Sequence, residues 1–176
     1  MPDEERVVLV AEDGTPIGTA LKAEVHTDRT PLHLAFSCHV VDTEGRLLVT
    51  RRALDKRTWP GVWTNSFCGH PLPGEPLAEA VLRRARHELG LELTDVHLAL
   101  PDFRYRAVDA GGIVENEICP VYTAVATAQP LPRADEVAEY RWVDAADLAV
   151  AARATPWAFS PWLVMQAAQL WAEAPA

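Results

Sequence analysis

The sequence predicts a single domain of mixed α/β (α+β) class, in which a β-sheet sandwich carries helices on its faces. Two observations lead to this prediction. β-rich segments both precede and follow one strongly amphipathic segment, and a second helical segment closes the chain. The length of 176 residues suits one domain with a sizeable core. Because no internal repeat or linker interrupts the chain, we expect the domain to span 1–176.

The first part of the chain predicts two pairs of strands. Residues 6–10 favour a strand, and a turn at Asp13 and Gly14 leads into a second, short extended piece. Residues 32–52 predict a clearer hairpin, with two β-rich runs around a turn at 42–45. We expect residues 53–75 to form a loop.

The clearest single element is a helix that begins at Pro76. Proline suits the first helical position, and Gly90 suits the left-handed residue just past a helix end. Apolar residues recur at a spacing of four and form one stripe, at Leu77, Val81, Ala85 and Leu89.

Three further elements complete the predicted fold. Residues 102–126 favour a second pair of strands around a turn at 109–112, and residues 136–143 favour another strand. Ser160 and Pro161 are typical of a helix start, so we expect a last helix up to about Trp171. The final residues, 173–176, resemble a frayed tail.

Composition and charge exclude several classes of protein. The net charge of −9 argues against a general nucleic-acid or anionic-membrane binder. No apolar run approaches the ~20 residues of a membrane span, and the start of the chain is acidic where a secretory signal would be basic. Three cysteines are too few, and odd in number, for a disulfide framework. We therefore expect a cytoplasmic protein, as a monomer or weak homodimer.

One basic segment stands out against the acidic background. Residues 51–57, "RRALDKR", carry four basic side chains and one acidic side chain. The segment either holds a small anionic ligand or is a solvated loop, and composition alone does not decide between them.

The central helix carries an incomplete version of a known signature. The spacing from Gly69 resembles the Nudix box, whose usual core is Gly, Glu, then Arg-Glu-apolar-x-Glu-Glu-x-Gly-apolar. The matching positions are Gly69, Glu75, Arg83, Ala85, Glu88, Gly90 and Leu91. Arg84 and His87 stand where two of the box glutamates belong.

These two departures bear on the chemistry. Nudix hydrolases use clustered carboxylates to hold divalent metals that polarise a pyrophosphate, and here Glu88 alone remains of the paired and core glutamates. Arg84 and Glu88 are four residues apart and share a helix face. That face either holds a diphosphate through Arg84 and Mg²⁺ through Glu88, or forms an ordinary ion pair.

Longer strings resemble one family within the Nudix superfamily. The segments "LHLAFS", "LLVTRRAL", "TWPGVWTNSFCGHP", "PDFRYRA", "GIVENEICPV" and "TPWAFSPW" are similar to type I isopentenyl-diphosphate Δ-isomerases, and the similarity runs from Lys22 to Gln166. The resemblance implies a Nudix-like fold and a double-bond shift in a five-carbon isoprenoid diphosphate. Isopentenyl diphosphate would be protonated at its terminal carbon, and the tertiary cation would lose a proton from C2.

The resemblance also implies the catalytic residues. It makes Cys68 and Glu117 the acid and base, although which of them donates the proton stays open. It implies that Tyr105 hydrogen-bonds the glutamate and that Trp162 stabilises the cation. By pattern alone, Tyr105 is equally an aromatic residue of a strand, and Trp162 a core residue. Trp162 nevertheless lies off the apolar stripe of its helix, on the side of Gln166 and Gln169.

Metal and diphosphate ligands are implied in the same way. One divalent metal, Mn²⁺, Zn²⁺ or Mg²⁺, would be held by His26, His33, His70, Glu115 and Glu117. The diphosphate would be bound by Lys22, Arg52, Lys56 and Arg84. A Mg²⁺ ion would join the diphosphate to Glu88 and the backbone carbonyl of Cys68. Without the resemblance, any one of the histidines would be an ordinary core or surface residue, and Glu115 and Glu117 an exposed acidic strand face.

Two alternatives remain at this point. A Nudix diphosphate hydrolase would share the fold but needs glutamates that the helix lacks. A non-catalytic binding module would explain the incomplete box but not the combination of thiol, carboxylates, Tyr105 and Trp162. We also expect Trp59 and Trp63 to help close the site against water.

Overall fold

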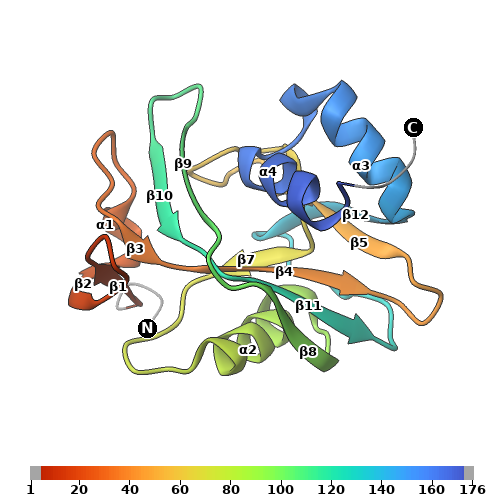
Figure 1. The fold of residues 1–176 in the computed structure, drawn as a ribbon, viewed down its shortest axis with the longest axis horizontal. Helices are drawn as coiled ribbons and strands as arrows, with labels where there is room; N and C mark the ends of the chain where they lie inside the picture. Colours follow the sequence, from red (N-terminus) through yellow and green to blue (C-terminus); the bar gives the residue numbers. More distant parts are fainter. Residues whose placement is uncertain (1–4, 173–176) are drawn as a thin grey trace.

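The computed structural model describes residues 5–172 and contains two mixed β-sheets (Figure 1). The first has the strand order β2-β1-β3-β10-β9 and the second β12-β5-β4-β11-β8, with β6 paired to β5 and β7 to β4. The strands are β1 Arg6–Val10, β2 Pro16–Leu21, β3 His33–Leu34, β4 Phe36–Val41, β5 Leu47–Arg52, β6 Trp63–Thr64, β7 Phe67–Gly69, β8 Leu93–Leu100, β9 Arg104–Val108, β10 Val114–Ile118, β11 Val121–Ala126 and β12 Val137–Val143. The tail expected at 173–176 lies outside the described residues.

The helices lie on both faces of the second sheet. Helix α2 covers one face, and α3 and α4 cover the other (Figure 1). The helical segments are α1 Lys22–Val25, α2 Leu77–Leu89, α3 Ala145–Ala154, the 3₁₀ turn η2 Pro156–Ala158 and α4 Pro161–Leu170. The predicted mixed-sheet fold with helices on its faces is therefore confirmed.

The two helices predicted from caps and periodicity both form, although Pro76, predicted as the first helical residue, is instead the N-cap of α2, with an extended ψ of 138°. On α2, Val81, Ala85 and Leu89 are fully buried, and Gly90 ends the helix at φ 62°. In α4, the Ser160 side chain accepts a hydrogen bond from the Leu163 backbone N–H, which is the expected N-cap.

Other local predictions were incomplete. The expected loop over 53–75 contains the short strands β6 and β7, whose two and three residues are too few to show an alternating pattern. Strand β8 was missed because bulges against β11 and a positive φ of 50° at Asp95 break its alternation. The alanine-rich α3 was missed because its polar and apolar faces differ little, although Asp144 caps its first turn.

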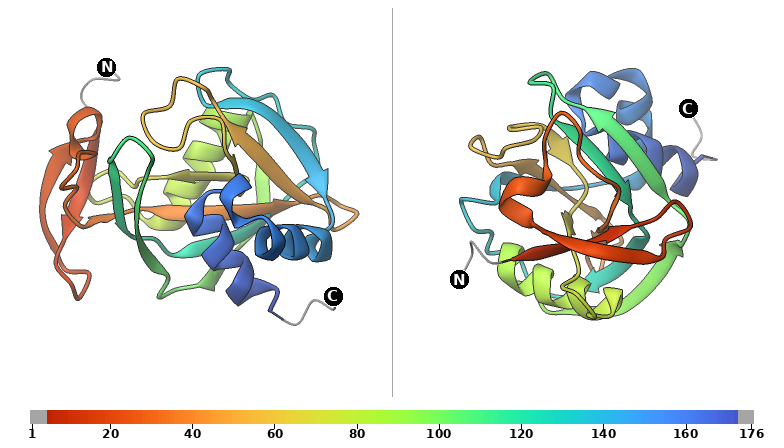
Figure 2. Two further views of the ribbon diagram at one scale, coloured as in Figure 1. Left: turned by 90° about the horizontal axis from the view of Figure 1, so that it is seen from above. Right: turned by 90° about the vertical axis from the view of Figure 1, so that its left-hand side faces the viewer.

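The divergence of β4 and β5 creates the interior of the molecule. The predicted hairpin forms, but Val41 and Leu47 are the one pair through which the two strands contact as a ladder among residues 5–172. Beyond it, β4 pairs with β11 and β7, and β5 pairs with β12 and β6. The segment 63–69 therefore fills the space between the separated strands. The first sheet stands at the end of the molecule opposite the β4–β5 turn (Figure 2).

None of the helices within residues 5–172 is both long enough and apolar enough to cross a membrane.

Candidate active site

A cavity of about 400 Å³ lies where the two sheets, α1 and α2 meet. Its lining includes most of the residues that the sequence assigned to the site: Lys22, His26, Arg52, Lys56, Cys68, His70, Arg84, Glu88, Tyr105, Glu115, Glu117 and Trp162. The remaining one, His33, is fully buried directly behind this lining, in contact with Glu117. Residues from eight separate stretches of the chain, His33 included, are thus brought to one enclosed space.

Three histidines and one glutamate form a compact buried cluster in the cavity wall. One ligand atom from each of His26, His33, His70 and Glu117 lies within 4.8 Å of the others. They come from four elements: the end of α1, strand β3, the residue after β7, and strand β10. In the sheet, Glu117 of β10 and His33 of β3 are direct parallel neighbours.

The atoms of this cluster fit a divalent metal. Within residues 5–172, four buried side-chain atoms have no hydrogen-bond partner, and all belong here: His26 Nε2, His33 Nε2, His70 Nδ1 and Glu115 Oε2. Buried polar groups without partners are rare, and a metal ion would satisfy them. The Pro31 carbonyl lies 2.9 Å from His33 Nδ1, so a proton on that nitrogen leaves the Nε2 lone pair free.

Glu115 lies at the edge of the cluster. Its Oε1 accepts a hydrogen bond of 2.8 Å from the Thr58 hydroxyl. Its free Oε2 is 3.0 Å from His26 Nε2. The carboxylate is therefore held by one oxygen and directs the other at the histidines.

Glu117 lies between the histidines and Tyr105. Its Oε1 is 3.2 Å from His70 Nε2 and 3.4 Å from His33 Nε2, and its Oε2 accepts a hydrogen bond of 2.9 Å from the Tyr105 hydroxyl. Burial acts to raise the pKa of this carboxyl, but the adjacent His33 and His70 rings outweigh it and hold the pKa well below its usual range. Burial also raises the pKa of Tyr105 well above normal, so the phenol stays a hydrogen-bond donor.

Cys68 presents a neutral thiol to the same cavity. It lies on β7 opposite Ser37 of β4, and its Sγ is 3.2 Å from Ser37 Oγ and 3.3 Å from Asn65 Oδ1. Burial raises the pKa of the thiol to about 12, so it carries its proton at neutral pH.

Trp162 closes one side of the cavity. Its indole is almost fully buried, and its Nε1 donates a hydrogen bond of 3.0 Å to Asn65 Oδ1. Trp59 packs edge-on against it at 5.4 Å between ring centroids, and the Arg52 guanidinium lies 5.5 Å from the ring. Trp63 packs near Phe159, and neither it nor Trp59 is among the residues that line the cavity. The Trp59 side chain approaches the site through its contact with Trp162, so the closure of the site by both tryptophans stays a prediction.

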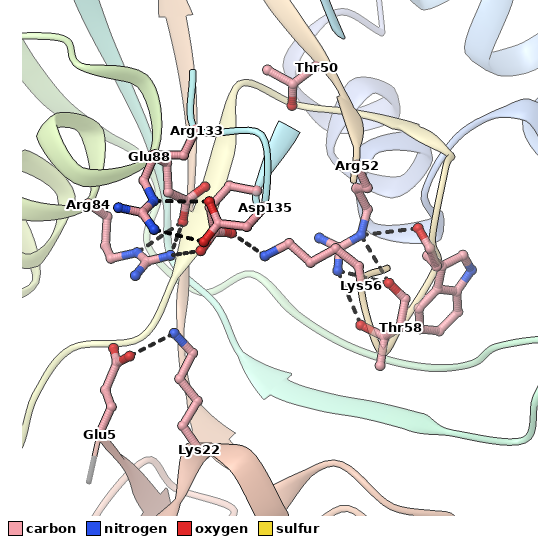
Figure 3. A network of polar contacts seen from close by, with 12 residues as sticks. Glu5, Lys22, Thr50, Arg52, Lys56, Thr58, Arg84, Glu88, Arg133 and Asp135 are labelled. Carbon is pink, nitrogen blue, oxygen red and sulfur yellow. Dashed lines mark hydrogen bonds and ion pairs between the residues drawn. The ribbon is translucent and has the colours of Figure 1, made fainter. Parts of the chain in front are cut away.

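The predicted phosphate-binding cations converge on another part of the cavity wall, each already held by oxygen atoms (Figure 3). Lys22 pairs with Glu5 at 3.0 Å. Arg52 donates to the Thr58 carbonyl at 2.8 Å and to the Trp59 carbonyl at 3.2 Å. These contacts fix the cationic heads at the cavity instead of leaving them mobile.

Arg84 and Lys56 share a carboxylate that the sequence did not reveal. Glu136 pairs with Lys56 and lies 3.4 Å from Arg84, whose Nε also donates to Glu88 at 2.9 Å. Arg84 and Glu88 therefore form an ion pair with each other, and both also line the cavity. Burial opposes ionisation of Glu136, but the Lys56 charge holds its pKa below normal.

Comparisons with known proteins identify the family of the chain. Residues 31–163 match the NUDIX domain family. The chain is 65% identical to an isopentenyl-diphosphate Delta-isomerase of Clavibacter michiganensis, over 96% of this chain and 87% of that one. It is 67% identical to one of Agromyces mediolanus, over 93% and 79% respectively.

Solved structures resemble the fold. A crystal structure of a Deinococcus radiodurans protein matches with a TM-score of 0.73 at 22% identity, covering 95% of this chain and 99% of that one. A MutT protein of Methanosarcina mazei matches with a TM-score of 0.61 at 19% identity, covering 79% and 92%. On the strength of the sequence matches, the chain belongs to the isopentenyl-diphosphate Delta-isomerase family of the Nudix superfamily.

Proposed function

We propose that Cys68 and Glu117 carry the two proton transfers by which this isomerase converts isopentenyl diphosphate to dimethylallyl diphosphate in isoprenoid biosynthesis. The observation that carries the assignment is that the Cys68 thiol and the Glu117 carboxyl group line the same cavity, and the pKa of the thiol is raised while that of the carboxyl group is lowered. One group able to give a proton and one able to accept it are what a double-bond shift requires.

The reaction balances with these two groups alone. One of them adds a proton to the terminal alkene carbon, which leaves a tertiary cation. The other removes a proton from C2, and the electron pair of that C–H bond forms the new double bond. The substrate gains and loses one proton, and one proton moves from one enzyme group to the other. It must return, directly or through solvent, before the next turnover in the same direction.

Aromatic side chains are suited to the cationic stage. The buried Trp162 lines the cavity, and a desolvated cation–π contact is worth about 2 kcal/mol. Trp59 covers it edge-on, which helps to exclude the water that would trap a carbocation. Tyr105 holds one oxygen of Glu117 by its hydroxyl and so fixes the direction of the carboxylate.

The histidine cluster is suited to a resident divalent metal, Mn²⁺, Zn²⁺ or Mg²⁺. His26, His33, His70, Glu115 and Glu117 would hold it, and it would supply positive charge that keeps the Glu117 carboxylate ionised and fixed. The mixed nitrogen and oxygen donors do not select one of the three metals.

The cation-lined part of the cavity is suited to the diphosphate. Lys22, Arg52, Lys56 and Arg84 would bind its oxygens, with Mg²⁺ held by Glu88 and the Cys68 carbonyl. Glu88 is the one carboxylate that α2 contributes to the lining among residues 5–172, which argues against the carboxylate-rich metal site of a hydrolase.

Four expectations from the sequence stay predictions. They are a cytoplasmic location, a single domain over 1–176, a monomer or weak homodimer, and the lack of nucleic-acid or membrane partners.

We predict that Cys68→Ala and Glu117→Gln each lower kcat by at least a thousandfold, because each removes one proton-transfer group. Dimethylallyl diphosphate formation should be followed by NMR, and folding by circular dichroism. Cys38→Ala is the control: Cys38 is a free, fully buried cysteine that does not line the cavity, so its loss should leave kcat within a fewfold of wild type. Near-normal turnover by either site variant would refute the assignment.

For the diphosphate, Lys56→Met should raise KM roughly tenfold or more through the loss of one charge-assisted contact. This variant is suitable because Glu136 keeps Arg84 as a partner and is not left as an unpaired buried charge. Steady-state kinetics with isopentenyl diphosphate measure the effect, and Arg46→Met, at an exposed pair away from the cavity, is the control. An unchanged KM in Lys56→Met would remove Lys56 from the binding site.

Removal of the metal should both inactivate the enzyme and lower its melting temperature. Without metal, the four partnerless atoms of the cluster stay unsatisfied, which costs about 1–3 kcal/mol each. Elemental analysis, activity and thermal unfolding should be compared before chelation, after it, and after adding Mn²⁺, Zn²⁺ or Mg²⁺. A metal-free protein with full stability and activity would contradict the proposed site.

A further inference from the structure

A buried serine contacts the reacting thiol from behind the cavity wall. Ser37 lies on β4, has no exposed surface and is paired in register with Cys68 of β7. Its Oγ is 3.2 Å from Cys68 Sγ and 3.4 Å from Cys119 Sγ. Ser37 does not line the cavity, so it contacts the thiol and not the substrate.

The serine is the end of a chain of buried polar side chains. Gln166 of α4 donates its Nε2–H to Ser37 Oγ at 2.9 Å, and its Oε1 lies 2.9 Å from His39 Nε2. Burial lowers the pKa of His39 to about 4, so the ring is neutral at pH 7 and donates one N–H to the glutamine. No more than 1% of His39 or Gln166 is exposed.

The direction of these hydrogen bonds decides where the serine hydrogen points. A hydroxyl has a single hydrogen, and Ser37 already accepts the Gln166 N–H with one lone pair. Its own O–H is therefore available to a sulfur, and Cys68 is the nearer of the two. On its other side, Cys68 donates its S–H to Asn65 Oδ1 at 3.3 Å. The sulfur thus receives one hydrogen and gives one.

A nearby serine shows what a purely structural role would look like. Ser66 is as fully buried as Ser37, but its hydroxyl joins two backbone groups, accepting from Val40 N–H and donating to the Leu48 carbonyl, both at 2.7 Å. Ser37 makes no such backbone contact among the hydrogen bonds of its hydroxyl in residues 5–172. Burying the three polar side chains of His39, Gln166 and Ser37 costs free energy unless all of them are hydrogen-bonded. Their chain of hydrogen bonds ends at the Cys68 sulfur.

We propose that Ser37, oriented by Gln166 and His39, is a positioning residue that fixes the Cys68 sulfur and keeps a hydrogen-bond donor directed at it. The proposal rests on the role of Cys68 proposed above. Whenever the sulfur is negatively charged during its proton transfer with the substrate, the serine hydrogen already points at it, so no side chain has to reorient as charge develops. Ser37 acts through Cys68 and touches no reacting carbon.

The first test compares Ser37→Ala with Ser66→Ala. Both remove one fully buried hydroxyl, so both should lower the melting temperature. Ser37→Ala should also lower kcat at least tenfold with KM within twofold of wild type, because substrate contacts are unchanged. Ser66→Ala should keep kcat within threefold. A Ser37→Ala enzyme whose kcat equals that of Ser66→Ala would overturn the proposal.

A second variant tests the chain itself and covers the case in which Ser37→Ala does not fold. Gln166→Met keeps the length and flexibility of the side chain but removes the donor to Ser37. It should lower kcat severalfold with KM unchanged, and the Ser37→Ala/Gln166→Met double variant should be no slower than Ser37→Ala. A wild-type kcat in Gln166→Met, or fully additive losses, would contradict the proposal.

Failure of this inference is distinguishable from failure of the proposed function. If wild-type protein forms no dimethylallyl diphosphate, the function is wrong. If wild type and Ser37→Ala turn over equally well, the function stands and only the positioning role is lost.

Discussion

The burial of Glu117 is the constraint on which the rest of the site depends. A carboxylate deep in a protein is stable only if charges and hydrogen bonds compensate its desolvation. Here His33, His70 and Tyr105 surround it, and they come from β3, the end of β7 and β9. The same groups that stabilise the carboxylate also hold it in the wall of the cavity that Cys68 lines. The contacts that stabilise the interior around Glu117 therefore also place this proton-transfer group in the cavity.

The separation of β4 from β5 makes room for this site. If the two strands had stayed paired along their length, the segment 63–69 would have no place in the sheet. Inserted between them, β7 presents Cys68 to the cavity from the front, while β4 presents Ser37 to the sulfur from behind. The cations on α1, β5 and α2 then line the remaining wall, where Glu5 pairs with Lys22 and Glu136 with Lys56 and Arg84.

Local features of the sequence predicted the helices well and the site only partly. Capping by Ser160 and the left-handed Gly90 act within a few residues, so they could be predicted without the fold. The metal cluster could not be predicted from spacing, because His26, His33 and His70 approach one another only through the pairing of β3 with β1 and β10 and through the loop after β7. These metal ligands were predicted from the resemblance to the isomerase family instead.

The residues that were missed share one property. Glu136, Asn65 and Ser37 act on other side chains rather than on a ligand, and no short pattern marks them. Gln166 alone gave a signal, as a polar residue beside the apolar stripe of α4. In the structure Gln166 is fully buried and bonded to Ser37.

The central claim, that the substrate exchanges protons with ionisable enzyme groups, is tested most directly by turnover in D₂O. The thiol and the carboxyl group exchange their hydrogens with solvent, whereas C–H bonds do not. NMR of dimethylallyl diphosphate made by deuterium-equilibrated enzyme should therefore show a deuteron in a methyl group, derived from the terminal carbon. Product formed at the normal rate without deuterium would mean that the hydrogen never leaves the substrate, and would contradict the account.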